Sequence, residues 1–144
     1  MASNVDALEA LGKAVRKYSP DLSFTMLEVG ALPLDGGAEE PFYALLDIFP
    51  QSRIIAFEVD EELCRELNAN ARSHVEYFPV ALGRSTERRT FYETQHPMCC
   101  SLYKPNEEVL SQYNNLQVAM LKAVGNVDTV DLDGFVAQND HRCG

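Results

Sequence analysis

The sequence of this protein has few positive charges and no long apolar run. It contains 12 Lys and Arg residues against 22 Asp and Glu residues, which gives a formal net charge of −10. A chain this acidic repels a phosphate backbone unless it carries a local basic stripe. The nearest approach to a stripe, Arg84 with Arg88 and Arg89, is interrupted by Glu87 and has no interleaved aromatic residues. We therefore expect no nucleic acid as a partner, and without a run of about 20 apolar residues we expect no membrane span.

Cysteine is scarce as well, and the chain shows no targeting signal. The first residues form neither a basic stretch nor an apolar one, so they do not resemble a signal peptide. We expect a cytoplasmic protein whose four cysteines, Cys64, Cys99, Cys100 and Cys143, are reduced. The adjacent Cys99 and Cys100 cannot easily bind one tetrahedral zinc ion together, and no C-x-x-C pair exists. Although His96 lies three residues before Cys99, a loop explains this segment better than a metal site, and no metal is expected.

The remaining composition is that of one folded domain. Of the 144 residues, 46% are hydrophobic and 24% are charged, so the chain is too apolar to be disordered. A chain of this length suits a single domain and can bury about 68–70% of the surface that it exposes when unfolded. We therefore expect one domain over residues 1–144.

Helices and strands are predicted to alternate along the first half of the chain. Apolar residues at helical spacing follow a cap at Ser3 or Asn4 and continue to Lys17. Pro41 suits the first turn of a second helix, and Asp60 can cap a third. Apolar runs predict buried strands over residues 24–29, 53–58 and 75–82. This alternation indicates βαβ units and hence an α/β fold, a Rossmann-like three-layer sandwich with a mostly parallel sheet.

The second half of the chain predicts shorter and less regular elements. Pro79 disturbs the third strand, because proline has no N–H group to donate to a sheet. Beyond it we expect, in order, a strand at 89–93, an ordered loop at 95–104, a short helix from 106, a strand at 126–131 and a short helix at 132–136. Residues 116–124 are apolar and ambiguous between helix and strand. The domain thus divides into an N-terminal helix (1–20), a βαβαβ core (22–83) and an irregular α+β extension (84–144).

An acidic residue, a glycine and an alanine stand where the first predicted strand ends: Glu28, Gly30 and Ala31. Ligands of open α/β sheets bind beyond the carboxyl ends of the strands, and a glycine there lets a ligand approach the backbone closely. The Glu28 carboxylate would repel a pyrophosphate but suits a cationic ligand such as S-adenosylmethionine. The glycine spacing also departs from the G-x-G-x-x-G pattern of dinucleotide sites. S-adenosylmethionine is therefore favoured, and a nicotinamide-dependent oxidoreductase is the less favoured alternative.

Three further positions are candidates for a site. Glu58 ends the second predicted strand, where a carboxylate can accept both hydroxyls of an adenosine ribose or can simply cap or pair at the strand end. Ala81 and Leu82 offer an adenine only backbone amides and apolar contact, and a buried strand end explains them equally well. His96 is the one candidate catalytic base that we can name. A lone histidine is more often structural, and no Ser-His-Asp or Cys-His arrangement can be assembled.

In these segments the sequence resembles the FkbM-type methyltransferases, which use S-adenosylmethionine and have a Rossmann-like fold. The resemblance extends over about residues 24–136 and lies in five segments: 27–31 (LEVGA), 54–60 (IIAFEVD, followed by Leu67 and Asn70), 80–83 (VALG), 100–102 (CSL) and 127–133 (VDTVDLD). Each segment is short, and the resemblance depends on their combination.

The resemblance implies which residues bind the cofactor: Glu28, Gly30, Ala31, Glu58, Val59, Ala81, Leu82 and Ser101. It implies that Glu28 and the turn after it lie near the methionine part of the cofactor and that Glu58 lies on the ribose. It implies that Ala81 and Leu82 lie near the adenine. The acceptor that it implies is a small hydroxylated or sugar-like molecule, which would be methylated on oxygen.

The family continues beyond the last matching segment with a strand that ends in an acidic residue, whereas this chain stops at Gly144. We therefore expect a fold truncated at its C-terminus, so that the chain is a methyltransferase or the cofactor-binding part of one. The alternative is a non-catalytic α/β binding module left by that truncation. A sheet cut short in this way has an open edge through which two copies can associate.

Overall fold

The computed structural model of the protein describes residues 4–33 and 41–139. The chain divides into two compact units, one formed by residues 1–79 and the other by residues 80–144. The fold is α/β, with helices and two small three-stranded sheets. Ser3, a predicted helix cap, and Cys143 lie outside the described residues. In the part of the chain that is described, no helix is both long enough and apolar enough to cross a membrane.

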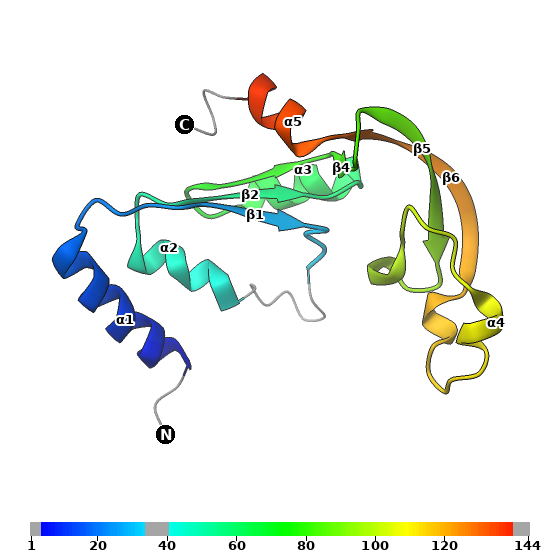
Figure 1. Ribbon diagram of the computed structural model, residues 1–144, viewed down its shortest axis with the longest axis horizontal. Coiled ribbons are helices and arrows are strands. Elements are labelled where there is room, and N and C mark those ends of the chain that lie inside the picture. Colours follow the sequence, from blue (N-terminus) through cyan, green and yellow to red (C-terminus); the bar gives the residue numbers. More distant parts are fainter. Residues whose placement is uncertain (1–3, 34–40, 140–144) are drawn as a thin grey trace. The chain divides into compact units, whose positions relative to one another are not determined.

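The first unit contains a parallel sheet of three strands in the order β1 (Thr25–Val29), β2 (Arg53–Phe57) and β3 (Val75–Phe78) (Figure 1). The register places Glu28 beside Ala56 and Ala56 beside Tyr77. These three side chains form one row on one face of the sheet, because successive residues of a strand alternate between faces. The first two predicted strands are thereby confirmed.

The helices of the first unit are α1 (Asn4–Tyr18), the 3-10 helix η1 (Pro41–Tyr43), α2 (Ala44–Ile48) and α3 (Glu61–Asn70). Figure 1 shows α1 and α2 on the same side of the parallel sheet, and a side chain at Gly12 of α1 would collide with Ile48. The cap of α3 is Asp60, as predicted, since its Oδ1 accepts a hydrogen bond of 3.0 Å from the Leu63 N–H. The helix expected after Pro41 begins as a 3-10 turn and is short.

The strand β2 is the centre of the first unit's core. Its residues Ile54, Ile55, Ala56 and Phe57 are each 3% exposed or less. Burial of four consecutive residues shows that both faces of this strand are covered, as is typical of the middle strand of a parallel sheet. Ile54 and Ala56 belong to a buried cluster that includes Tyr43 of η1, and this face carries the candidate site described below.

The prediction that β1 is a buried strand is wrong. Leu27 and Val29 are 42% and 65% exposed, and β1 lies at the edge of the sheet. Met26, which points to the opposite face, packs against the core cluster. An apolar run is typical of a strand that is covered on both faces. Whether a strand is covered depends, however, on the elements that pack against it and not on its own sequence. The pattern of exposure along β1 alternates, so one face of the strand is left uncovered by the described residues while the other packs against the core.

The prediction of one continuous strand over residues 75–82 is also wrong. The strand β3 ends at Phe78, and Ala81–Leu82 forms a separate strand, β4, which belongs to the second sheet. Pro79 lies at the break, since proline cannot donate a hydrogen bond to the ladder of a sheet. Ala81 and Leu82, the residues expected near an adenine, therefore do not continue β3, which is the strand that lies beside Ala56.

The second unit contains a mixed sheet in the order β4, β6 (Leu121–Val130) and β5 (Glu87–Thr94), in which β5 and β6 are antiparallel and β4 runs parallel to β6. Its helices are short: η2 (Pro97–Cys99), α4 (Glu107–Leu110), η3 (Gln117–Ala119) and α5 (Leu132–Gln138). The strands expected at 89–93 and 126–131 and the helices expected from 106 and 132 are confirmed. The ambiguous segment 116–124 is divided between η3 and β6.

Candidate functional site

The candidate site lies where β1 and β2 end, and its first element is the row formed by Glu28, Ala56 and Tyr77. Ala56 is 0% exposed and bears only a methyl group. A residue this small leaves room above the sheet between the two longer side chains of the row. Tyr43 of η1 reaches this place, since it belongs to the same buried cluster as Ala56 and contacts both of the other residues.

Tyr43 connects the two ends of the row. Its hydroxyl donates a hydrogen bond of 2.6 Å to Oε2 of Glu28 and lies 3.0 Å from the hydroxyl of Tyr77. Burial raises the pKa of Tyr43 far above its ordinary value, and the hydrogen bonds with Glu28 and Tyr77 raise it further. The phenol therefore stays protonated and acts as a permanent hydrogen-bond donor to the Glu28 carboxylate.

The turn after β1 is tied to the end of β2. Gly30 has a φ of +75°, a left-handed conformation that glycine adopts without steric cost. The N–H groups of Gly30 and Ala31 both donate to the carbonyl oxygen of Phe57, at 2.9 and 3.0 Å. A Cβ atom placed on Gly30 would meet no described atom within 4 Å. The turn is thus closed on its backbone side, and no described atom crowds the side where Gly30 lacks a Cβ atom.

Glu58 follows β2 and is only 8% exposed. Its Oε1 accepts a hydrogen bond of 3.1 Å from the N–H of Asp60, which is the local strand-end contact that needs no ligand. Its Oε2 has no hydrogen bond to another described residue. Among the described residues, every side-chain oxygen or nitrogen atom that is fully buried has a hydrogen-bond partner. Oε2 of Glu58 has none, so it must be accessible at the surface. Glu58 therefore combines a local role with one accessible acceptor in a largely buried place.

These contacts bring several of the predicted residues together at one end of the parallel sheet. Gly30 and Ala31 bond to the carbonyl group that immediately precedes Glu58, and Glu28 lies on the neighbouring strand. Val59, which comes next in the chain, is 38% exposed. The first unit therefore presents two carboxylates and an open glycine turn at the carboxyl ends of two adjacent parallel strands.

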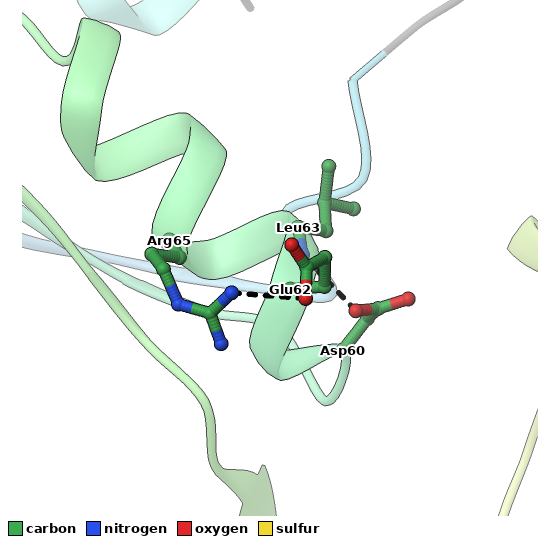
Figure 2. A network of polar contacts seen from close by, with 4 residues as sticks. All are labelled: Asp60, Glu62, Leu63 and Arg65. Atoms are coloured by element: carbon green, nitrogen blue, oxygen red, sulfur yellow. Dashed lines mark hydrogen bonds and ion pairs between the residues drawn. The ribbon is translucent and has the colours of Figure 1, made fainter.

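The helix α3 begins next to Glu58 and contains a buried thiol. Figure 2 shows its first turn, where Arg65 pairs with Glu62 at 2.9 Å beside the Asp60 cap. The Cys64 thiol donates to the carbonyl oxygen of Glu58 at 3.4 Å and is 2% exposed. Burial, with the nearby Glu58 charge, raises the pKa of the Cys64 thiol. A thiol held in its protonated form is a poor nucleophile, so Cys64 is a packing residue.

Three of the predicted cofactor residues lie in the second unit. Ala81 and Leu82 form β4 and pair with the end of β6, with Ala81 7% exposed. Ser101 pairs with Tyr92 through backbone hydrogen bonds of 2.8 and 3.0 Å, and its Oγ accepts the N–H of Tyr103 at 3.1 Å. The Ser101 hydroxyl thus stabilises a local turn. The parallel sheet that carries the two carboxylates contains none of these three residues.

His96 also lies in the second unit and serves its own backbone. Its Nδ1 accepts the N–H of Met98 at 3.3 Å, and its carbonyl oxygen accepts the Thr94 hydroxyl at 2.8 Å. The ring therefore caps η2, which is the structural role that lone histidines more often have. Within residues 4–33 and 41–139, no group of three or more His, Cys, Asp or Glu side chains is placed to hold a metal ion.

Sequence reasoning missed Tyr43 and Tyr77 as residues of the site. The pattern after Pro41 predicts only an apolar helix face, and Tyr77 is predicted only as part of a strand. One signal was present, because a small residue such as Ala56 in the middle of a buried strand leaves room for a long side chain from a covering helix. The sequence does not say which side chain fills that room, since Tyr43 and Tyr77 lie 34 positions apart.

The interpretation of this site depends on its geometry. Comparison of the chain with models of protein families, with curated proteins and with solved structures gave no match.

Proposed function

We propose that this protein binds S-adenosylmethionine at the carboxyl end of its parallel sheet. In this proposal it is a methyltransferase, or the cofactor-binding part of one, that acts on a small hydroxylated or sugar-like acceptor. The observation that carries the proposal is the open turn at Gly30 between the carboxylates of Glu28 and Glu58. The carboxyl ends of the strands are where ligands of open α/β sheets bind.

The residues present fit this cofactor. The accessible Oε2 of Glu58 is an acceptor for ribose hydroxyls, and a charge-assisted hydrogen bond of this kind contributes about 1.5–3 kcal/mol. The negative charge of Glu28 suits an ammonium or sulfonium group. The space beside Gly30 lets the ligand pass close to the backbone. The same two carboxylates would repel a pyrophosphate, which argues against a dinucleotide.

The proposal also concerns the fold to which the parallel sheet belongs and the cellular compartment of the protein. The three parallel strands would be part of a Rossmann-like three-layer sandwich, in keeping with the resemblance to the FkbM-type methyltransferases. The free thiols Cys64, Cys99 and Cys100 suit a reducing compartment, and the cytoplasm is the location that we propose.

The chain's own contribution to methyl transfer would be alignment. When bound, S-adenosylmethionine supplies an electrophilic methyl group on a sulfonium centre. Glu58 would hold the ribose and Glu28 the amino group, so that the methyl group is presented in one direction. Near-attack geometry alone can lower a barrier by about 7–11 kcal/mol. No residue is assigned as the base, because Nδ1 of His96 is already engaged by a backbone N–H group.

The substitution Glu58→Ala tests the proposal directly. We expect isothermal titration to show binding of S-adenosylmethionine and of S-adenosylhomocysteine to the wild type, and at least about tenfold weaker binding to the variant, because a charge-assisted hydrogen bond is lost. Glu66→Ala is the matched control, since it removes the same charge from an exposed position of α3 and should bind like the wild type. A wild type that gives neither heat nor a thermal shift at millimolar ligand would contradict the proposal.

A second candidate function is that of a non-catalytic binding module. The exposed face of β1 favours it, because Leu27 and Val29 offer apolar surface beside an unoccupied strand edge within the described sheet. Such a module would bind a partner chain or nothing. An assay of methyl transfer from labelled S-adenosylmethionine to a panel of sugars separates the two functions, since the module would label none of them.

A further inference from the structure

The two edges of the parallel sheet differ, and the edge at β3 is closed. The Phe78 carbonyl oxygen accepts the Glu58 N–H at 3.1 Å, so it points along the sheet towards the chain that continues β2. Backbone groups alternate in direction along a strand, so those of Tyr77 point away from β2. The Asn68 side chain occupies both of them, since it donates to the Tyr77 carbonyl oxygen at 2.7 Å and accepts the Tyr77 N–H at 2.9 Å. Another strand could not pair with this position without displacing Asn68.

The edge at β1 has no such cover within the described residues. The Phe24 carbonyl oxygen accepts the Arg53 N–H at 2.9 Å, and the Gly30 N–H donates to the Phe57 carbonyl oxygen at 2.9 Å. The residues at both ends of β1 thus face β2, and the same alternation makes every second residue between them face outward. The residues whose backbone groups point outward are Thr25, Leu27 and Val29. Among the described strands β1 pairs with β2 alone, so these groups have no partner strand there.

The sequence of β1 lacks the features that commonly protect an exposed edge, which are lysine, proline and a β-bulge. Its residues (TMLEV) include neither lysine nor proline, and their register with β2 is continuous. On the uncovered face of the strand, Leu27 and Val29 are 42% and 65% exposed. The edge therefore fits an extended strand of another chain, which would bond to its backbone and pack against its apolar side chains.

The strand β1 is complementary to itself when two copies run antiparallel. With Leu27 at the centre, it lies opposite Leu27 of the second copy, and the outward backbone groups of the two strands meet. Thr25 then lies opposite Val29 of the second copy, and Met26 lies opposite Glu28. This register pairs the whole strand and sets no charge opposite a like charge. A register centred on Glu28 would set two carboxylates directly opposite each other, which is destabilising.

We propose that β1 is a dimerisation edge, at which a second copy of this chain adds its own β1 in antiparallel direction around Leu27. The two three-stranded parallel sheets would thereby join into one, about a two-fold axis. The inference goes beyond the proposed function and does not depend on a ligand. The net charge of −10 on each copy opposes the association, so we expect the dimer to be favoured when salt screens the repulsion.

A disulfide between two copies tests the register. In a hydrogen-bonded antiparallel pair the Cα atoms are about 5.5 Å apart, which suits a disulfide, so Leu27→Cys should cross-link under mild oxidation. Val29→Cys is the matched control: its side chain is more exposed, but the register separates the two copies of this position by about 13 Å along the strand. Both variants are made with Cys99, Cys100 and Cys143 replaced by serine.

Non-reducing electrophoresis over time measures the dimer formed. We expect Leu27→Cys to cross-link at least about tenfold faster than Val29→Cys, because only the first pair of thiols meets in the proposed register. Chance collisions would give the opposite order, since Val29 is 65% exposed and Leu27 42%. Equal or faster cross-linking of Val29→Cys, or none of Leu27→Cys, would overturn the inference.

Light scattering over a range of protein and salt concentrations tests the association itself, without any added cysteine. Leu27→Pro removes an N–H group that points to the second copy and takes none from the ladder with β2, so we expect the dimer to be lost. Leu27→Val keeps this N–H group and should associate like the wild type. Circular dichroism shows whether the proline variant is folded.

Each outcome of the mass measurement decides. A wild type that is monomeric at all concentrations of protein and salt overturns the inference, whether or not a different partner binds at β1. A folded Leu27→Pro variant that still forms the dimer overturns it as well, because the contact then lies elsewhere. Neither experiment contains S-adenosylmethionine, so a failure here is distinct from a failure of the proposed cofactor site.

Discussion

The two units of this protein are held together in different ways. Among the described residues, every apolar side chain that is buried lies in the first unit except Ala81 and Phe135. The second unit depends instead on the ladder between β5 and β6 and on a polar centre. Thr129 is 1% exposed there, and its hydroxyl lies within hydrogen-bonding distance of the carbonyl oxygens of Ser85 and Glu87, at 2.8 and 3.0 Å.

The difference explains why the candidate site belongs to the first unit. A carboxylate can be oriented for a ligand only if its supports do not move, and Tyr43 is supported by an apolar cluster around Ala56. In the second unit, Ser101 and His96 use their polar atoms to stabilise turns. The predictions below test this contrast from the largest expected effect to the smallest.

The largest effect is expected from removing an aromatic side chain in each unit. Phe57→Ala should lower the free energy of unfolding by about 3–5 kcal/mol, because a 1% exposed ring leaves a cavity in the core. Phe91→Ala, on the partly exposed strand β5, should cost about 1–2 kcal/mol, since less area is buried. Urea unfolding followed by circular dichroism measures both. Similar losses for the two variants would show that the units do not differ in this way.

A smaller effect is expected at the polar centre of the second unit. Thr129→Val keeps the shape of the side chain but removes its hydroxyl, so the carbonyl groups of Ser85 and Glu87 lose a donor. We expect a loss of about 1–3 kcal/mol in the same unfolding experiment. The matched control, Thr90→Val on an exposed position of β5, should remain within about 0.5 kcal/mol of the wild type. A Thr129→Val variant as stable as the control would show that the hydrogen bonds of the Thr129 hydroxyl do not stabilise the second unit.

The smallest effect on stability is expected at the edge of the parallel sheet. Val29 is 65% exposed, so Val29→Lys should change the free energy of unfolding by less than about 0.5 kcal/mol. If copies of the chain associate through β1, the charge should reduce that association, because a lysine on an edge strand disfavours pairing. Size-exclusion chromatography with light scattering measures the mass. Val124→Lys, at a 59% exposed position of β6, is the control and should not change it.

The outcome of that experiment decides between the two sheets as the site of association. A wild type that is monomeric at every concentration contradicts association through β1. The same loss of mass in Val29→Lys and Val124→Lys would show that the effect comes from added charge and not from the edge of the parallel sheet.

Much of the first unit could be predicted from local patterns. The cap at Asp60 depends only on residues within one helical turn, and so the start of α3 was predicted correctly. The run over residues 54–57 is apolar on both faces, and β2 is indeed buried on both. The same logic was wrong for β1, because burial depends on which strand and helix lie alongside it. No local pattern carries that information.

The candidate site was predictable only in part, for a related reason. Glu28, Gly30 and Glu58 follow from their places at strand ends, and the structure brings them to one end of the parallel sheet. Ala81 and Leu82 were expected in the same sheet, but the break at Pro79 assigns them to the other. A proline marks a disturbance in a strand, yet the sequence does not say whether the strand bends or changes sheet.

The sequence by itself determined the acidic charge, the alternation of helices and strands, and the positions of the strand-end carboxylates. These features depend on composition and on spacings of a few residues. Only the tertiary structure decided that β1 is an edge strand and that Tyr43 joins Glu28 to Tyr77 above Ala56. The physical reason is that hydrogen bonds between residues 15 and 34 positions apart exist only after the sheet and its covering helix have come together.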